Sequence, residues 1–403
     1  MSPALVLFIS LALVLLLLRL KVHPGGAVFC GSILLSLLVL PPAETPRLLL
    51  KAATDAQTLR LLAIVICALV MSRLMEGRGM LTKLANALEG IGPKLAIHVA
   101  PVAIGLMPLP GGAVVSAAAV KDLVRRLHLT PVQATFINFW FRHLCEFGTP
   151  IYPGVIMAGI ILSVPLSFML LHLAPIWMLM ILFGSIVSWR ILRHAPVPDG
   201  SSRDGESIPR QLLRSAWPVI LVFVLVLAGL DAAPAFFLTV VALVLQQRMP
   251  RQEVLEGLKY GLGPKILFLL YSVMLYKNVV EVSGAADALF TDMQAAGLSH
   301  AVILIALPLL IGFSTGLSSA MVGISIPLLV PFLVSEGAVD GVSLMLAYGA
   351  GGLGYMLSPL HLCLVLSAEY FQARLASVYR LLLPPATAAL ISLTALYFLL
   401  GNT

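Results

Sequence analysis

An asparagine, an arginine and a glutamate lie at helical spacing inside an apolar part of the chain. Asn138, Arg142 and Glu146 are four residues apart in the stretch "NFWFRHLCEFGTP" and share one face of a helix. Charged side chains at bilayer depth are rare and usually functional. The planar guanidinium of Arg142 can hold a carboxylate or phosphate through two parallel hydrogen bonds. The spacing therefore predicts an anion site at Arg142, with Asn138 as a second substrate ligand.

The glutamate of this stretch has two possible roles. Glu146 can pair structurally with Arg142, or it can carry the proton or cation that couples transport. His143 points off the shared face, and we expect it to be a packed or interfacial histidine. The segments "HLCE" and "HLC" have neither the ligand count nor the spacing of a metal site, so we expect no metal ligands there.

The composition of the chain is that of a membrane protein. Of the 403 residues, 60% are hydrophobic and 11% are charged, and the mean hydropathy is +1.03. Globular domains have about 25% charged residues, and apolar runs long enough to cross a bilayer recur along this chain. All four cysteines fall in apolar segments, which argues against a secreted disulfide framework. We predict an all-α, multi-pass membrane protein.

Glycine, proline and hydroxyl residues break the apolar segments at four places. The breaks are "LPGGAVVSA" (109–117), "GTPIYPG" (148–154), "GFSTGLSS" (312–319) and "GAGGLGYMLSP" (349–359). Because the same order of segments occurs twice, we predict inverted repeats at 1–194 and 211–403, joined by a cytoplasmic linker at 195–210. Each repeat would have five crossings and one re-entrant hairpin. The hairpins are expected at about 92–127, on the cytoplasmic side, and about 298–334, on the outer side; the broken helices are expected at about 131–162 and 340–371.

The positive charges favour this topology. Of the 25 Lys and Arg residues, it puts three on the outer side (Arg47, Lys51 and Arg60), two within the membrane (Arg142 and Lys277), and the other twenty on one side. Lysine and arginine accumulate in cytoplasmic loops. Both termini are therefore expected outside the cytoplasm, and the net charge of +7 needs no nucleic-acid partner.

Irregular backbone at membrane depth persists only where protein or a watery cavity covers it, so the four breaks should meet near the midplane. Hydroxyls before proline at Thr149 and Ser358 predict helix N-caps. New helix starts suit anions, and carbonyls of the preceding half-helices suit Na⁺. The predicted substrate ligands are Gly111, Gly112, Ser116, Asn138, Arg142, Thr149, Ser314, Thr315, Ser318 and Ser358. The backbone of Gly111, Gly148, Gly316 and Gly354 is the place where we expect a coupling Na⁺ ion to bind.

These features predict a secondary transporter of a small organic anion, driven by Na⁺ or H⁺. The alternative is a cation/proton exchanger in which Glu146 is the exchanged carboxylate and Arg142 tunes it. A purely structural role would leave the paired breaks unexplained. The sequence has no nucleophile elbow, phosphate loop or dinucleotide fingerprint, so we expect neither an enzyme nor an organic cofactor.

The motifs "LMPLPGGAVVSA" and "NFWFRHLCEFGTPIYPG" resemble the Ion Transporter superfamily, which includes divalent anion–sodium symporters and the large membrane subunit of tripartite periplasmic transporters. Within it they look most like an uncharacterised bacterial integral-membrane family. The resemblance covers nearly the whole chain. It implies a scaffold domain and a mobile transport domain, an elevator mechanism, a homodimer and the bacterial inner membrane. The Ser-Asn-Thr signature of dicarboxylate symporters is absent from "LPGGAVV" and "STGLSSA", so the resemblance implies the architecture and not dicarboxylate specificity.

Overall fold

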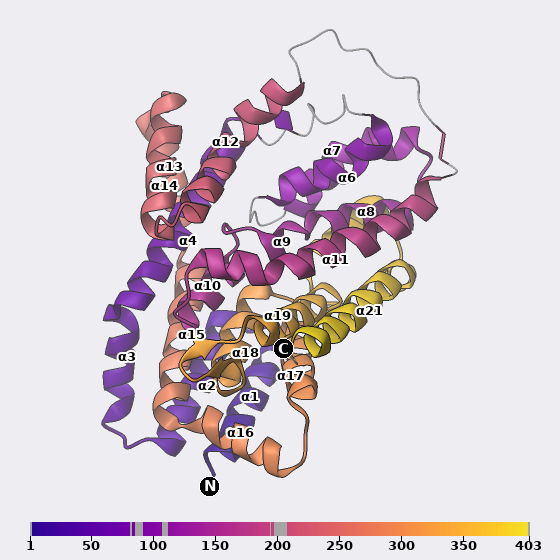
Figure 1. Ribbon diagram of the computed structural model, residues 1–403. Coiled ribbons are helices and arrows are strands. Elements are labelled where there is room, and N and C mark those ends of the chain that lie inside the picture. The colour runs from indigo at the N-terminus through magenta and orange to yellow at the C-terminus, as the bar shows by residue number, and fades with distance from the viewer. Residues whose placement is uncertain are drawn as a thin grey trace.

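The protein is an assembly of helices in which long apolar helices surround shorter, interrupted ones (Figure 1). The computed structural model describes residues 2–80, 83–84, 92–106, 112–193, 195–196 and 208–401. Within these ranges the first half of the chain forms α1 (Pro3–Arg19), α2 (Pro24–Val39), α3 (Glu44–Thr54), α4 (Ala56–Gly77), α6 (Pro93–Gly105), α7 (Gly112–Arg126), α8 (Pro131–Arg142), α9 (Cys145–Gly148), α10 (Pro153–Ile161) and α11 (Leu166–Leu192).

The second half of the chain follows a similar order of elements. It forms α12 (Ile208–Leu227), α13 (Ala232–Gln246), α14 (Arg251–Gly261), α15 (Pro264–Ser283), α16 (Ala285–Ala295), α17 (His300–Thr315), α18 (Ser318–Leu333), α19 (Gly341–Met356), α20 (Leu362–Phe371) and α21 (Leu375–Leu400). A small antiparallel hairpin of β1 (Val334–Ser335) and β2 (Ala338–Val339) connects α18 to α19.

Two groups of helices pack around one another. In the first group, α2 packs against α15 and α13 against α4, and the short amphipathic helices α3 and α14 lie beside α15 and α4. In the second group, α6 packs against α7 and α8, while α17 packs against α18 and α19. Helices α7 and α18 reach the other half of the chain, where they pack against α20 and α10. The hairpin helix of each half therefore packs against the interrupted helix of the other half.

Five spans in the described part of the chain are long and apolar enough to cross a membrane. They differ in how much of their surface the protein covers. In the span Pro131–Ile161, which contains α8 to α10, 89% of the most apolar window is buried, against 22% in α11 and 28% in α21. Lipid can therefore solvate α11 and α21. Protein surrounds the span in which the helix is interrupted, because non-helical backbone at membrane depth must be covered.

The chain leaves helical geometry inside two apolar segments, only the first of which is among these five spans. Residues 149–152 separate α9 from α10, and residues 357–361 separate α19 from α20. The glycine-rich run 349–356, which belongs to the break expected at 349–359, is helical. Its glycines permit close packing: a Cβ on Gly354 would lie 2.9 Å from the Cα of Leu309 in α17. Small residues here serve contact between α17 and α19.

Candidate functional site

Arg142 ends helix α8 in the protein interior, next to the starts of α7 and α20. A capping box at Thr130 and Gln133 fixes the start of α8. Only 2% of Arg142 is exposed, and its Nη1 donates to Sγ of Cys363 over 3.3 Å. A Cβ on Gly112 would lie 2.5 Å from Nη2 of Arg142. The guanidinium therefore lies between the first residue of α7 and the second residue of α20.

Asn138 joins the same three helices one turn earlier. Its Oδ1 accepts a hydrogen bond from Ser116 of α7 over 2.7 Å. Its Nδ2 donates to the carbonyl of Ala113 (3.2 Å) and to Oγ of Ser367 in α20 (3.0 Å). The amide is thus saturated by protein groups, as buried amides usually are. Asn138 and Ser116 hold α7, α8 and α20 together one turn before Arg142, and a substrate-binding role for either residue stays a prediction.

Glu146 is also buried, with 8% of the residue exposed. It lies in the short helix α9, directly before the break at 149–152. Its Oε1 is 3.7 Å from Nε2 of His143, and its carboxylate interacts electrostatically with Arg142 and with Tyr355 of α19. The acidic group therefore lies near both the arginine of α8 and helix α19 of the second half.

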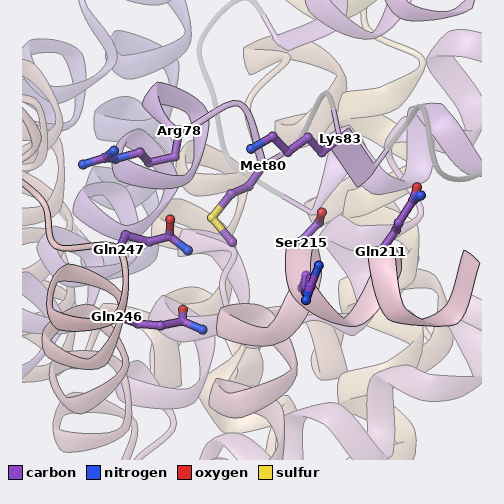
Figure 2. Close-up of a pocket in the computed structure, with 8 residues that line it drawn as sticks. Arg78, Met80, Lys83, Gln211, Ser215, Gln246 and Gln247 are labelled. Atoms are coloured by element: carbon purple, nitrogen blue, oxygen red, sulfur yellow. The ribbon is translucent and has the colours of Figure 1, made fainter. Parts of the chain in front are cut away.

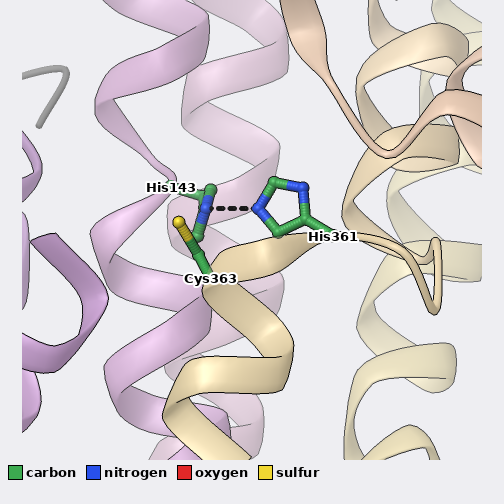
Figure 3. A group of neighbouring side chains, drawn as sticks. All are labelled: His143, His361 and Cys363. Carbon is green, nitrogen blue, oxygen red and sulfur yellow. Dashed lines mark hydrogen bonds between the residues drawn. The ribbon is translucent and has the colours of Figure 1, made fainter. Parts of the chain in front are cut away.

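Two histidines connect the halves of the molecule. His143 is fully buried, and its Nε2 is 2.9 Å from Nε2 of His361, which lies in the break between α19 and α20 (Figure 3). Nδ1 of His361 faces the carbonyl oxygen of Gly316 over 2.8 Å. Gly316 ends α17 with a φ of +65°, a conformation that suits glycine. The tip between α17 and α18 is thus linked through His361 to His143, the residue that follows Arg142.

The prediction that Thr149 caps the next helix is wrong. Helix α10 begins at Pro153, and Tyr152 occupies its N-cap position without a side-chain hydrogen bond. The Thr149 hydroxyl donates back to the carbonyl of Cys145. The physical reason is the second proline: Pro153 keeps the preceding residue out of helical geometry, and Tyr152 accordingly has a ψ of 128°.

The corresponding N-cap prediction in the second half, at Ser358, is also wrong. Helix α20 begins at Leu362, and Ser358 instead accepts a hydrogen bond from the amide of Leu360, which closes a turn before the helix. Helix α18 begins at Ser318, with Leu317 at the N-cap position. The Thr315 hydroxyl accepts from the amide of Leu317 and thus stabilises the turn at Gly316.

The remaining predicted residues are spread over the second hairpin and the chain breaks. Gly111 lies outside the described residues. Ser314 is partly exposed, while Ser318 lies close to Gly154 of α10, next to the hydroxyl of Tyr348. Gly148 packs against the ring of Trp177, and Gly354 packs against the backbone of Leu309. Close helix packing accounts for both glycines, and Na⁺ at their carbonyls stays a prediction.

Three residues of the site were missed in the sequence. His143 was expected to be a packed histidine, and His361 and Cys363 were given no role. The tripeptide His-Leu-Cys occurs twice, at 143–145 and 361–363. This recurrence is the sequence signal by which these residues could have been recognised. Only the fold brings these segments, far apart in sequence, into contact.

A separate pocket lies away from these residues. It has a volume of about 550 Å³ and opens between the end of α4 and helices α12 and α13 (Figure 2). Basic and amide side chains line it, among them Arg78, Lys83, Gln211 and Gln247. Arg78 also forms an ion pair with Glu253 of α14. Since none of the interrupted helices contributes to its lining, this pocket is distinct from the Arg142 site.

Comparison with known proteins identifies the fold and the family. Among solved structures, the YdaH transporter of Alcanivorax borkumensis, described as having an unusual topology, superposes with a TM-score of 0.65 at 16% sequence identity. The match covers 90% of each chain, so the two share a multi-pass helical membrane fold. A search of curated proteins finds no match. A family model described as "Protein of unknown function (DUF401)" matches residues 1–400, and the chain therefore belongs to the DUF401 family.

Proposed function

We propose that this protein is a secondary active transporter that moves a small, carboxylate-type organic anion across the membrane, coupled to Na⁺ or H⁺. The observation that carries the proposal is Arg142. Its guanidinium is buried at the meeting point of the two interrupted helices, beside the first turns of α7 and α20. A buried guanidinium beside helix starts offers a carboxylate both a bidentate partner and favourable dipoles. The similar fold of a protein described as a transporter supports this class of function.

We propose that the chain consists of two inverted repeats. Support comes from packing that recurs in matched pairs: α2 with α15 and α13 with α4, α7 with α20 and α18 with α10, α11 with α19 and α21 with α8. Interior prolines recur as well. Pro101 and Pro308 are each the ninth residue of their helices, α6 and α17, and Pro175 and Pro384 are each the tenth, in α11 and α21. Such repeats, with broken helices at their interface, are typical of secondary transporters.

The mechanism proposed is of the elevator type that the Ion Transporter superfamily uses. Helices α1–α4 and α12–α15 would form the scaffold, and the hairpins with the interrupted helices would form the mobile transport domain. Membership of that superfamily, the homodimer and the inner-membrane location with both termini outside the cytoplasm belong to the same proposal. The Asn138 network supports a unit that moves as one body, because it ties α7, α8 and α20 together.

The alternative function is a cation/proton exchanger centred on Glu146. One observation favours it: this carboxylate is buried next to the chain break, 3.7 Å from an imidazole nitrogen. In an exchanger Glu146 is the exchanged group and Arg142 only adjusts its affinity. The two functions differ in which of the two side chains the substrate contacts.

Ligand screening by thermal unfolding tests the proposal. A ligand that binds only the folded protein raises its apparent stability by mass action. The purified protein is screened against carboxylic acids with and without Na⁺, next to Arg142→Gln and a surface control, Arg193→Gln. We expect at least one acid to stabilise the native protein and the control equally and to leave Arg142→Gln unchanged. Equal stabilisation of all three would contradict an anion site at Arg142.

A further inference from the structure

The histidine pair has a third donor beside it. The Cys363 Sγ and one ring nitrogen each of His143 and His361 all lie within 4.8 Å of one another (Figure 3). Both histidines are buried, and the cysteine is partly buried. His143 follows the last residue of α8, while His361 and Cys363 span the start of α20. The cluster therefore lies between an element of the first half of the chain and one of the second half.

The backbone fixes the tautomers of both rings. Nδ1 of His143 faces the carbonyl of Phe139 over 2.6 Å, and Nδ1 of His361 faces the carbonyl of Gly316 over 2.8 Å. A carbonyl oxygen only accepts hydrogen bonds, so each Nδ1 carries the proton. The two Nε2 atoms of the neutral rings then face each other as lone pairs, 2.9 Å apart. This contact is repulsive unless a positive species lies between the nitrogens.

The thiol decides between the two species that fit there. A shared proton needs only the lone pairs of the two nitrogens, whereas a transition-metal ion takes three or four ligands. The thiol of Cys363 supplies a third ligand. Imidazoles whose other nitrogen donates to a backbone carbonyl are the usual outer-shell arrangement of metal-binding histidines. Zn–N bonds of about 2.0–2.1 Å in a tetrahedral site imply an N···N separation of about 3.3 Å. A small rotation of either ring provides that separation.

The charges around the cluster suit a bound cation. The carboxylate of Glu146 lies 3.7 Å from Nε2 of His143. A metal-bound Cys363 thiolate would add a second negative charge. Together they offset the positive charge of Arg142, whose Nη1 is 3.3 Å from the sulfur. Two imidazoles and a thiolate are donors that favour Zn²⁺ or Cu⁺ over Mg²⁺ or Ca²⁺.

We propose that His143, His361 and Cys363 form a binding site for a transition-metal ion of the Zn²⁺ or Cu⁺ class. Neither His-Leu-Cys segment makes a site by itself, and for that reason the sequence argued against one. The ion would cross-link the end of α8 to the start of α20 and so connect the two halves of the chain beside Arg142. The proposal is independent of the transported substrate and of the direction of transport.

Cobalt absorption spectroscopy tests this site directly. The metal-free, full-length protein in detergent is titrated with Co²⁺, whose tetrahedral thiolate complexes absorb in the near ultraviolet and in the visible. We expect one equivalent to give both bands and Zn²⁺ to abolish them by displacement. Cys363→Ser should remove the near-ultraviolet thiolate band, and His361→Gln should weaken binding at least tenfold. Cys67→Ser and His128→Gln, at a distant thiol and an exposed imidazole, serve as matched controls.

The outcomes separate a metal from a shared proton. No saturable bands in the native protein would show that the pair holds only a proton and would overturn the proposal. Bands that persist unchanged in Cys363→Ser would also overturn it, because the sulfur would then not be a ligand. Helical content by circular dichroism and elution as a single species show that each variant is folded. The measurement uses no substrate, so it can fail while the transport proposal stands.

Discussion

The guanidinium of Arg142 lies against the backbone of Gly112, with no room for a side chain between them. A Cβ built on Gly112 would come within 2.5 Å of Nη2, although the nearest atoms all belong to the far end of one side chain. Arg142 is buried, so it cannot move out into solvent to make room. This glycine therefore determines the position of the guanidinium and, with it, the geometry of the anion site that we propose.

Gly112→Ala should impair ligand binding without preventing assembly. The added methyl group displaces the guanidinium but meets no backbone atom of another helix. We expect the affinity for the stabilising acid to fall at least tenfold in a binding assay, while yield and elution volume stay native. Gly77→Ala in α4 is the matched control, since a Cβ there meets nothing within 4 Å. Native affinity in Gly112→Ala would show that the position of the guanidinium is unimportant.

Asn138→Ala should lower stability. The substitution leaves the Ser367 hydroxyl without its amide partner and removes the amide oxygen that accepts from Ser116. Unsatisfied buried polar groups cost about 1–3 kcal/mol each. Thr394→Ala is the control, because its hydroxyl only bonds back to Leu390 within α21. We expect a clearly lower midpoint of thermal unfolding for Asn138→Ala and a change within error for the control; equal midpoints would show that the network does not stabilise the fold.

Cysteine labelling tests the inverted topology. In our account the start of α14 lies in the cytoplasm and the β1–β2 hairpin lies on the outer side. Gln252→Cys and Ser335→Cys, both at exposed positions, should therefore react with a membrane-impermeant maleimide from opposite faces. The unmodified chain in the same vesicles gives the background from the native cysteines. Reaction of both from one face would contradict the inverted repeats.

Much of the helical framework follows from composition, but the caps do not. The break expected at 148–154 lies where α9 and α10 separate, but the one expected at 349–359 is helical up to Met356, and only its end lies between α19 and α20. The caps at Thr149 and Ser358 were wrong because each depends on its local turn: Pro153 delays the start of α10, and Ser358 closes a turn of its own. Hydroxyl–proline pairs indicate a helix start only to within a few residues.

Some site residues could be recognised from the sequence, whereas the contacts between the two halves of the chain could not. Arg142 and Asn138 were recognisable because polar groups in an apolar helix are conspicuous. His143 is packed as expected, but its contact with His361 could not be foreseen, because that residue lies 218 residues away and helical periodicity relates only neighbours on one helix. Contacts between the halves depend on how α8 and α20 pack, and this packing follows from the whole fold.

Comparing Arg142→Lys with Glu146→Gln shows which of the two side chains binds the transported species. Both proteins are reconstituted in proteoliposomes, and uptake and binding of the stabilising acid are measured beside the native chain. An ammonium cannot reproduce the bidentate contact of a guanidinium, so we predict that Arg142→Lys loses at least tenfold in affinity. Glu146→Gln should keep anion binding and lose mainly ion coupling. Full activity in Arg142→Lys together with none in Glu146→Gln would contradict an anion transporter and favour the exchanger.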